Sequence, residues 1–420
     1  MFPEANAKFD PGAVGIQGTS VPDRALLLAR LPALAAEIAK GAGRRDRERE
    51  LPFEAFRLFR ESGLGALRVP TRLGGPGGSI PDYVETIVTL AAADSNVAHA
   101  LRSHFNFCES LILAPSSAKA RTYLSKVLDG KLFGGAAAEL GTARPGDIEN
   151  TKLVRQGESY RLNGKKYYAT GTAFADYASF GALDETGKLV SALVPADRAG
   201  VNILDDWDGM GQRLTASGGV DLVDVEVFAH EVGERGQSMM TGLIGRHTSA
   251  LRQLHLIACV NGIVRNIFSD AVEYVRKHAR TTRHADAEKA VDDAFVQQVT
   301  GRLAATVFAV DAIIVEAGRV MGQAADALAA EAPDAEDLVL KSALATARAQ
   351  LVAGRLGLNA AEEMFEIGGG STTSRKYNFD RHWRNIRTIL NHNPLNHKAR
   401  VVGDYFLNGT ETHLREGRVF

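Results

Sequence analysis

Residues 374–394, SRKYNFDRHWRNIRTILNHNP, form the most informative segment of the sequence. Most of the segment favours a helix. Three of its four arginines, Arg381, Arg384 and Arg387, are spaced three positions apart. Ion pairs with nearby acids such as Asp380 explain these arginines better than a ligand does. The segment ends in Asn391-His392-Asn393-Pro394, a polar stretch without a carboxylate.

Helical periodicity occupies most of the remaining chain. Beyond Gly242, apolar residues recur at three- and four-residue spacing through GLIGRHTSALRQLHLIACVNGIVRNIFSDAVEYVRKHA and two further long runs. The same spacing extends from Pro22 to about Ala114, as in PFEAFRLFRESG, which ends in glycine. We therefore expect an α-helical N-terminal domain over residues 20–130 and a bundle of long helices over residues 240–415.

Residues 131–235 are expected to form a β domain. KLVSALVPA, GVNIL and GGVDLVDVEVF are short and rich in Val, Leu and Ile, which is typical of strands. In SYRLNGKKYYATG, Asn163-Gly164 suits the positive φ angles of a tight hairpin turn. Tyr168 and Thr170 flank a small residue in this segment, so we expect both side chains on one face of a strand. The order α, β, α in one chain narrows the fold.

The composition indicates a small, roughly neutral partner. Lys and Arg number 49 against 50 Asp and Glu, so the net charge of −1 favours neither nucleic acid nor an anionic membrane. The two cysteines, Cys108 and Cys259, predict neither a disulfide framework nor a cysteine-based zinc site, and they fit the cytoplasm. We expect no metal, no export signal and no membrane span.

Common cofactor and hydrolase motifs do not occur. No G-x-G-x-x-G follows a predicted strand, which argues against a nicotinamide dinucleotide site. Gly164-Lys165-Lys166 lacks the rest of a P-loop, and neither H-E-x-x-H nor G-x-S-x-G is present.

Several segments together resemble the acyl-CoA dehydrogenase superfamily. LPFEAFRLFRESGLGALRVPTRLGGPG at 51–77 looks like its N-terminal helix and loop, and NGKKYYATG at 163–171 looks like its flavin-stacking strand. Residues 374–394 are similar to the signature of the dibenzothiophene monooxygenase branch. WDGMGQRLTASGG at 207–219 resembles that branch's Trp-x-x-x-Gly-Gln-Arg-x-Thr-x-Ser-Gly segment. Where the commonest dehydrogenases carry a catalytic Glu, this chain has Asn391-His392-Asn393-Pro394, so the base for α-proton removal is missing.

The resemblance implies an α+β, acyl-CoA dehydrogenase-like fold with an α-helical N-terminal domain, a central β-barrel-like domain and a C-terminal four-helix bundle. It also implies a homotetrameric, two-component flavin-dependent monooxygenase. Reduced FMN would come from a separate NAD(P)H-flavin reductase. Oxygen would add to it as a C4a-hydroperoxide and oxygenate a small substrate that contains sulfur or nitrogen or is aromatic.

An FAD-dependent acyl-CoA dehydrogenase or oxidase with a relocated base is the alternative. Its candidate bases are Glu109, Glu139 and Glu366. A homologue that keeps the fold without catalysis is a further alternative.

The resemblance also assigns roles to individual residues. His392 is the first catalytic candidate, because an imidazole can hydrogen-bond the oxygenated flavin and relay its proton. His104 is preferred to His99 as the active-site histidine of the first domain, since five residues separate them and they cannot share a helix face. The Thr170 hydroxyl is expected to donate a hydrogen bond to N5 or O4 of the flavin. A surface loop for His392 and a half-buried strand for Thr170 are the ordinary alternatives.

The expected cofactor-binding residues fall into two groups. Around the flavin ring they are Tyr168, Thr170, Trp207, Thr215 and Ser217, with core packing as the alternative for Trp207. Around the phosphate they are Arg280, Arg283, Ser371, Thr372 and Ser374. In this superfamily such phosphate contacts often come from a neighbouring subunit, and relatives have an Arg near the position of Ser371.

Overall fold

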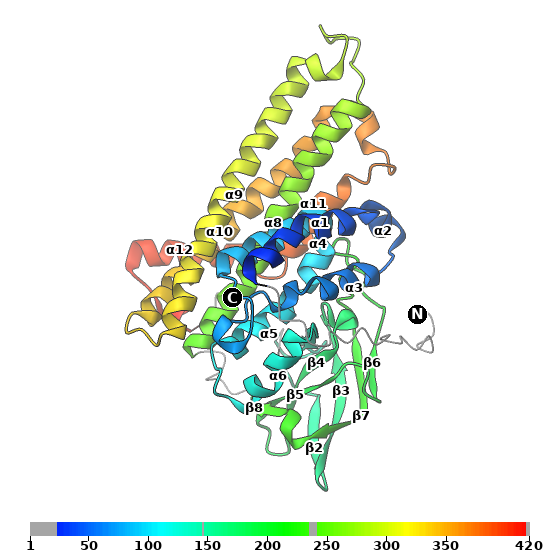
Figure 1. The fold of residues 1–420 in the computed structure, drawn as a ribbon. Helices are drawn as coiled ribbons and strands as arrows, with labels where there is room; N and C mark the ends of the chain where they lie inside the picture. Colours follow the sequence, from blue (N-terminus) through cyan, green and yellow to red (C-terminus); the bar gives the residue numbers. More distant parts are fainter. Residues whose placement is uncertain (1–22, 145–146, 235–241, 417–420) are drawn as a thin grey trace.

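The computed structural model describes residues 23–144, 147–234 and 242–416. Figure 1 shows an elongated helical bundle above a layer of shorter N-terminal helices, with the sheet below them. No helix within these ranges is long and apolar enough to cross a bilayer. The helical, β and helical order expected from the sequence is confirmed.

Within the described residues, the N-terminal part contains six α-helices. They are α1 (Arg24–Ala39), α2 (Ala42–Glu48), α3 (Phe53–Ser62), α4 (Ile80–Ala100), α5 (Arg102–Ile112) and α6 (Ala118–Leu128). Ser79 begins α4 with a capping box, in which its hydroxyl accepts from the Asp82 N–H and the Asp82 carboxylate accepts from the Ser79 N–H. The apolar face of α4 packs against α8 in the main core.

Eight strands form one sheet in the described residues. They are β1 (Phe133–Ala136), β2 (Lys152–Gln156), β3 (Ser159–Lys166), β4 (Tyr177–Leu183), β5 (Leu189–Pro195), β6 (Val201–Ile203), β7 (Val220–Phe228) and β8 (Val232–Glu234). The order is β6-β7-β3-β2-β4-β5-β8, with β1 beside β4. The antiparallel run β6-β7-β3-β2 meets the antiparallel run β4-β5-β8 where β2 and β4 run parallel, joined by the single pair Lys152 and Leu183, and β1 also runs parallel to β4. Their inner side chains form a separate core.

The C-terminal part is a bundle of long helices. It contains α8 (Leu243–Lys277), α9 (Ala294–Ala329) and α10 (Ala335–Glu363), followed by α11 (Asp380–Leu390), α12 (Leu395–Asn408) and α13 (Thr412–Arg415). The three long helices pack on one another, and α11 and α12 pack on α10. Arg384 pairs with Asp380 at 2.7 Å, so the expected ion pairs along α11 are present.

Two local expectations for the β domain were wrong. Asn163-Gly164 lies inside β3, at a bulge against β7, and the β2–β3 turn falls before it. Gly164 is required there because a Cβ would collide with Thr151. The strand also ends at Lys166, and Tyr168 has a φ of +57°. Tyr168 is therefore exposed while Thr170 is buried, and the two do not share a strand face.

Candidate active site

The segment 207–219 passes through the junction of the three parts of the chain. Its backbone approaches α11 so closely that a Cβ on Gly211 would collide with the carbonyl oxygen of Arg384. The next residue, Gln212, is buried and has a φ of +51°. A non-glycine residue in this conformation persists only where surrounding contacts hold it.

Gln212 bonds to each neighbouring part of the protein. Its N–H donates to Asn385 Oδ1 of α11 at 2.7 Å, and its side-chain Nε2 donates to Ser95 Oγ of α4 at 2.9 Å. Its carbonyl accepts from Trp207 Nε1 at 2.8 Å and from Thr215 Oγ1 at 2.9 Å. Gln212 thus links the N-terminal helices, the β domain and the C-terminal helices.

His99 contacts the remaining side-chain atom of Gln212. The amide oxygen Oε1 lies 3.1 Å from His99 Nδ1, so this nitrogen carries the proton and donates. The other ring nitrogen, Nε2, is buried and has no hydrogen-bond partner among the described residues. Burial, and then the charge of Arg102, lowers the pKa of His99 to about 3, so the ring is neutral at physiological pH. His99 therefore presents an acceptor to a ligand.

A kink in α4 brings Ser95 and His99 to this junction. Asp94 has non-helical angles of φ −153° and ψ 107°, and its carboxylate accepts from the Asn96 N–H at 3.0 Å. It also pairs with Arg45 at 2.8 Å. Asp94 thus acts as an N-cap that starts a new helical direction.

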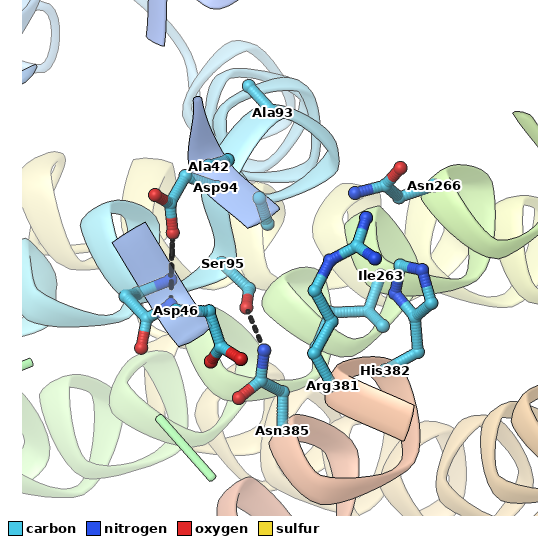
Figure 2. A pocket seen from close by; sticks show the side chains of 12 residues that line it. Ala42, Asp46, Ala93, Asp94, Ser95, Ile263, Asn266, Arg381, His382 and Asn385 are labelled. Atoms are coloured by element: carbon cyan, nitrogen blue, oxygen red, sulfur yellow. Dashed lines mark hydrogen bonds between the residues drawn. The ribbon is translucent and has the colours of Figure 1, made fainter. Parts of the chain in front are cut away.

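A polar pocket lies between α2, the kink of α4 and α11. Figure 2 shows Asp46, Asp94 and Ser95 on one side of it and Arg381, His382 and Asn385 on the other. Asn385 Nδ2 donates to Ser95 Oγ at 3.3 Å. Ser95 and Asn385 both line this pocket and both hydrogen-bond to Gln212. The pocket lining therefore helps to fix the position of Gln212.

Three buried hydroxyl groups form a hydrogen-bonded chain that ends on Gln212. Thr215 donates its only hydroxyl proton to Gln212 O, so Ser217 Oγ must donate to Thr215 Oγ1 across 2.7 Å. Thr170 Oγ1 must then donate to Ser217 Oγ, also at 2.7 Å. All three protons point toward Gln212. Thr170 consequently keeps only lone pairs for a ligand and acts as an acceptor, not as the donor expected from the sequence.

An aromatic pair lies beside this chain of hydroxyls. The side chain of Tyr168 is exposed, and its ring meets the half-buried ring of Trp207 edge to face, with 6.3 Å between centroids. Trp207 is fixed by its hydrogen bond to Gln212. The pair offers an apolar surface of the kind on which a flat ring packs.

His392 faces the N-terminal helices from the loop after α11. Arg102 Nη1 lies 2.9 Å from His392 Nε2, and because a guanidinium can only donate, Nε2 accepts. The proton is therefore on Nδ1, which donates to Asn393 Oδ1 at 3.2 Å. The charge of Arg102, and then desolvation, holds the pKa of His392 well below its usual value, although the residue is exposed on the loop after α11. His392 is a neutral ring with a defined tautomer.

His104 makes contacts that leave neither ring nitrogen free. Nε2 donates to the carbonyl of Gly65 at 2.9 Å, and Nδ1 accepts from the Phe133 N–H at 3.3 Å. The ring is buried beside Phe105 and Phe133. The structure therefore favours His99 over His104 at the junction, contrary to the preference drawn from the sequence.

The residues expected at a phosphate lie elsewhere in the chain. Arg280 and Arg283 follow α8, in a turn that Figure 1 shows at the end of the bundle remote from the sheet. Ser371 and Thr372 lie in the 3₁₀ turn Gly369–Thr373, which follows α10 at that end, and Ser374 comes next. Within one chain these groups do not meet the hydroxyls at the junction.

The candidate bases of the alternative reading are engaged or exposed. Glu109 is buried and accepts from Arg68 at 2.9 and 3.1 Å. Burial opposes its ionisation, but Arg68 lowers the pKa of Glu109 to about 2. Glu139 is held by Lys166 at 2.8 Å and by three backbone N–H groups, and Glu366 is exposed. None of these carboxylates is poised as a general base.

Two family models match the chain. The acyl-CoA dehydrogenase N-terminal domain matches residues 31–131, and the acyl-CoA dehydrogenase C-terminal domain matches residues 254–397.

Individual relatives match over most of their length. Probable FMNH2-dependent monooxygenase SfnC of Pseudomonas putida is 29% identical over 92% of this chain and 95% of that protein. Dibenzothiophene monooxygenase of Rhodococcus qingshengii is 28% identical over 84% of this chain and 86% of that protein. The crystal structure of FMN-bound TdsC from Paenibacillus sp. A11-2 has 30% identity and a TM-score of 0.81, and covers 91% of this chain and 98% of that chain.

The three-part fold and these relatives define a flavoprotein oxidoreductase with the acyl-CoA dehydrogenase fold. The missing carboxylate after α11 separates it from the commonest dehydrogenases. The chain belongs to the acyl-CoA dehydrogenase family, in its flavin-dependent monooxygenase branch alongside the dibenzothiophene monooxygenases. The predictions of family, fold class and monooxygenase are confirmed.

Sequence reasoning missed three residues that organise the junction. Gln212 stands in the quoted Gly-Gln-Arg segment, but only its contacts reveal its part. Ser95 carries no local signal. Arg102 follows His99 by one helical turn, and that spacing was the available clue.

Proposed function

We propose that this chain is a cytoplasmic, two-component monooxygenase that uses reduced FMN and O2 to oxygenate a small sulfur-containing substrate. The direction of the hydroxyl chain is the observation that carries the proposal, because Thr170 offers lone pairs to a ligand. A reduced flavin ring bears N–H groups at positions where the oxidised ring has lone pairs. A junction that presents acceptors therefore suits the reduced form.

The residues at the junction fit a flavin ring. Tyr168 and Trp207 would pack on the ring, and Thr170 would accept a hydrogen bond from it. His99 Nε2 is a buried acceptor without a partner among the described residues, and it could accept a further hydrogen bond. Reduced FMN would supply the two electrons that activate O2. His392 holds its proton on Nδ1, from which it can be passed to an oxygen atom, while Arg102 keeps Nε2 occupied.

We further propose a homotetramer in which the phosphate contacts cross between copies. Arg280, Arg283, Ser371, Thr372 and Ser374 would serve a neighbour's flavin, since they lie far from the hydroxyl chain of their own copy. Phe308 and Val315, two turns apart on α9, have exposed fractions of 77% and 60%, as expected of a face covered in an assembly. Light scattering with size-exclusion chromatography measures the assembly directly.

Reduced flavin must come from a separate NAD(P)H-dependent reductase, since the chain has no Rossmann motif for a nicotinamide dinucleotide. The decisive experiment supplies chemically reduced FMN to the protein, admits O2 with dibenzothiophene or an organic sulfide, and measures oxygenated product and hydrogen peroxide. We expect product in proportion to flavin consumed. Tighter binding of reduced FAD than of reduced FMN, or oxidation of an acyl-CoA without oxygen transfer, contradicts the proposal.

A further inference from the structure

The side-chain amide of Gln212 lies between two partners that can each donate or accept. Its Oε1 accepts from His99 Nδ1 at 3.1 Å, and its Nε2 donates to Ser95 Oγ at 2.9 Å. A half-turn of the amide exchanges its oxygen and nitrogen, and a hydroxyl and a neutral imidazole suit either arrangement. After such a turn His99 would carry its proton on Nε2 and present a donor to a ligand. A further group is needed to fix the direction of these bonds.

Ser95 has a proton that neither of its hydrogen bonds uses. Its Oγ accepts from Gln212 Nε2 and from Asn385 Nδ2, so its O–H is left to donate elsewhere. Among the described residues this proton has no acceptor. Ser95 is buried and lines the polar pocket between α2, the kink of α4 and α11 (Figure 2).

Asp46 supplies an unused acceptor in the lining of the same pocket. Its Oδ2 accepts from Arg384 Nη2 at 2.9 Å and from Asn378 Nδ2 at 2.8 Å. Its Oδ1 is buried and has no hydrogen-bond partner among the described residues. A buried acceptor left in this way is costly unless a water or a ligand donates to it.

We propose that this pocket binds one water molecule, which accepts from Ser95 O–H and donates to Asp46 Oδ1. The pocket has a volume of about 20 Å³, which is enough for one water. Because a carboxylate in an ion pair can only accept, the water must donate to Asp46 and Ser95 must donate to the water. Ser95 then accepts from the Gln212 amide, whose oxygen accepts from His99 Nδ1. Asp46 is thus a positioning residue that sets the tautomer of His99.

The inference rests on the proposed function and names a further determinant of flavin selectivity. With FMN at the junction, His99 Nε2 offers the ring an acceptor, which suits the N–H groups of the reduced form. The water-linked bonds from Asp46 therefore favour reduced flavin, although Asp46 lies on the far side of Gln212 and Ser95 from His99.

A high-resolution crystal structure of the protein without flavin tests for the water directly. We expect density for one water at about 2.5–3.0 Å from both Asp46 Oδ1 and Ser95 Oγ. Direct contact between these two oxygens, or a pocket without such density, overturns the inference.

Asp46→Asn keeps the shape of the side chain and permits the opposite direction of bonding. The new amide can keep its oxygen on Arg384 and donate from its nitrogen to the water. Ser95 then donates to Gln212, and His99 Nε2 becomes a donor. We expect the ratio of the oxidised to the reduced FMN dissociation constants to fall about three- to tenfold, which aerobic and anaerobic titrations measure. Ser95→Ala interrupts the same bonds at a second point and should also lower the ratio.

Three comparisons separate this role from a structural one. Asp380→Asn is the matched control, because it removes the other carboxylate that pairs with Arg384 and should leave the ratio unchanged. In a His99→Phe background, Asp46→Asn should no longer change the ratio, since Asp46 acts through His99. An equal change in both dissociation constants in Asp46→Asn indicates a structural role alone and overturns the inference.

The same titrations distinguish failure of the inference from failure of the proposed function. If wild type binds FMN in either state and the ratio does not respond to Asp46→Asn or Ser95→Ala, the inference alone is overturned. If wild type binds neither form of FMN, the proposed function is overturned together with it.

Discussion

Thr215 sets the direction of the hydroxyl chain, since its proton goes to Gln212 O. In Thr215→Val the Ser217 and Thr170 protons are free to reverse, so Thr170 can donate to the oxidised ring as well as accept from the reduced one. We expect the ratio of the oxidised to the reduced FMN dissociation constants to fall about three- to tenfold, the equivalent of one hydrogen bond. Anaerobic and aerobic titrations measure the two constants. Thr215→Ser keeps the hydroxyl and should keep the ratio, and an unchanged ratio in Thr215→Val contradicts the acceptor role of Thr170.

His392 is the residue for which proton transfer can be tested most directly. His392→Phe keeps much of the bulk but removes both nitrogens, including the Nδ1 proton. Reduced FMN should still be consumed by O2, with hydrogen peroxide appearing in place of product. General acid–base assistance is worth about 10²–10⁴-fold, so the product yield should fall far below that of wild type. His104→Asn, in the N-terminal core, is the comparison. Wild-type coupling in His392→Phe removes the residue from the oxygen-transfer machinery.

The segment 207–219 depends on glycine at its closest approach to α11. Gly211→Ala places a methyl group against the Arg384 carbonyl, so we expect the free energy of unfolding to fall by about 1–3 kcal/mol. Flavin affinity should fall with it, because Gln212 follows directly. Gly403→Ala on α12 is the matched control, since its Cβ meets nothing within 4 Å and alanine in a helix should add about 0.5–1 kcal/mol. Urea unfolding compares the two. Wild-type stability in Gly211→Ala shows that the segment can move away from α11.

Elements were predictable from local patterns, whereas their contacts were not. Three- and four-residue spacing predicted the helices because one apolar face is enough to define them. Asn163-Gly164 gave a wrong prediction of a hairpin turn. The glycine is needed because a Cβ would collide with Thr151, a residue that is distant in the sequence. His99 was passed over because of its five-residue separation from His104. That separation spans the break between α4 and α5 at Leu101, and only the coordinates show that His99 contacts Gln212. Sequence resemblance predicts that Thr170, Thr215 and Ser217 bind the flavin, but the direction of their hydrogen bonds to one another can be read only from the coordinates.

The whole molecule should lose stability under mild acid. Burial first, and neighbouring charges after it, lowers the pKa of His99 and His255 to about 3, and burial lowers that of His104 and His382 to about 4. Below the ordinary histidine pKa of 6.5 the unfolded chain binds protons that the folded chain does not. Stability is therefore complete above about pH 6.5 and falls as pH drops toward 4, by about 1.4 kcal/mol per pH unit for each histidine.

Urea midpoints at pH 7, 6 and 5 measure this slope. His255→Gln removes one of the four rings and should make the slope shallower by one proton. A midpoint that does not change between pH 7 and pH 5 contradicts the buried neutral state of these histidines.

The turn that carries Arg280 and Arg283 stands at the far end of its own bundle, away from the hydroxyls of the same chain. If that turn completes the site of a neighbouring copy, each site combines Thr170 of one copy with Arg280 and Arg283 of another. A substitution in the turn and a substitution of Thr170 then impair contributions from different copies. Two impaired alleles, Arg280→Ala with Arg283→Ala and Thr170→Val, should then give more activity when expressed together in one cell than either gives alone. Mixed assemblies would contain some sites built wholly from intact halves. Such intragenic complementation would show that the turn and Thr170 of one chain serve different sites, as their separation in the structure suggests. Its absence would indicate that both sets of residues act in the same site of one chain.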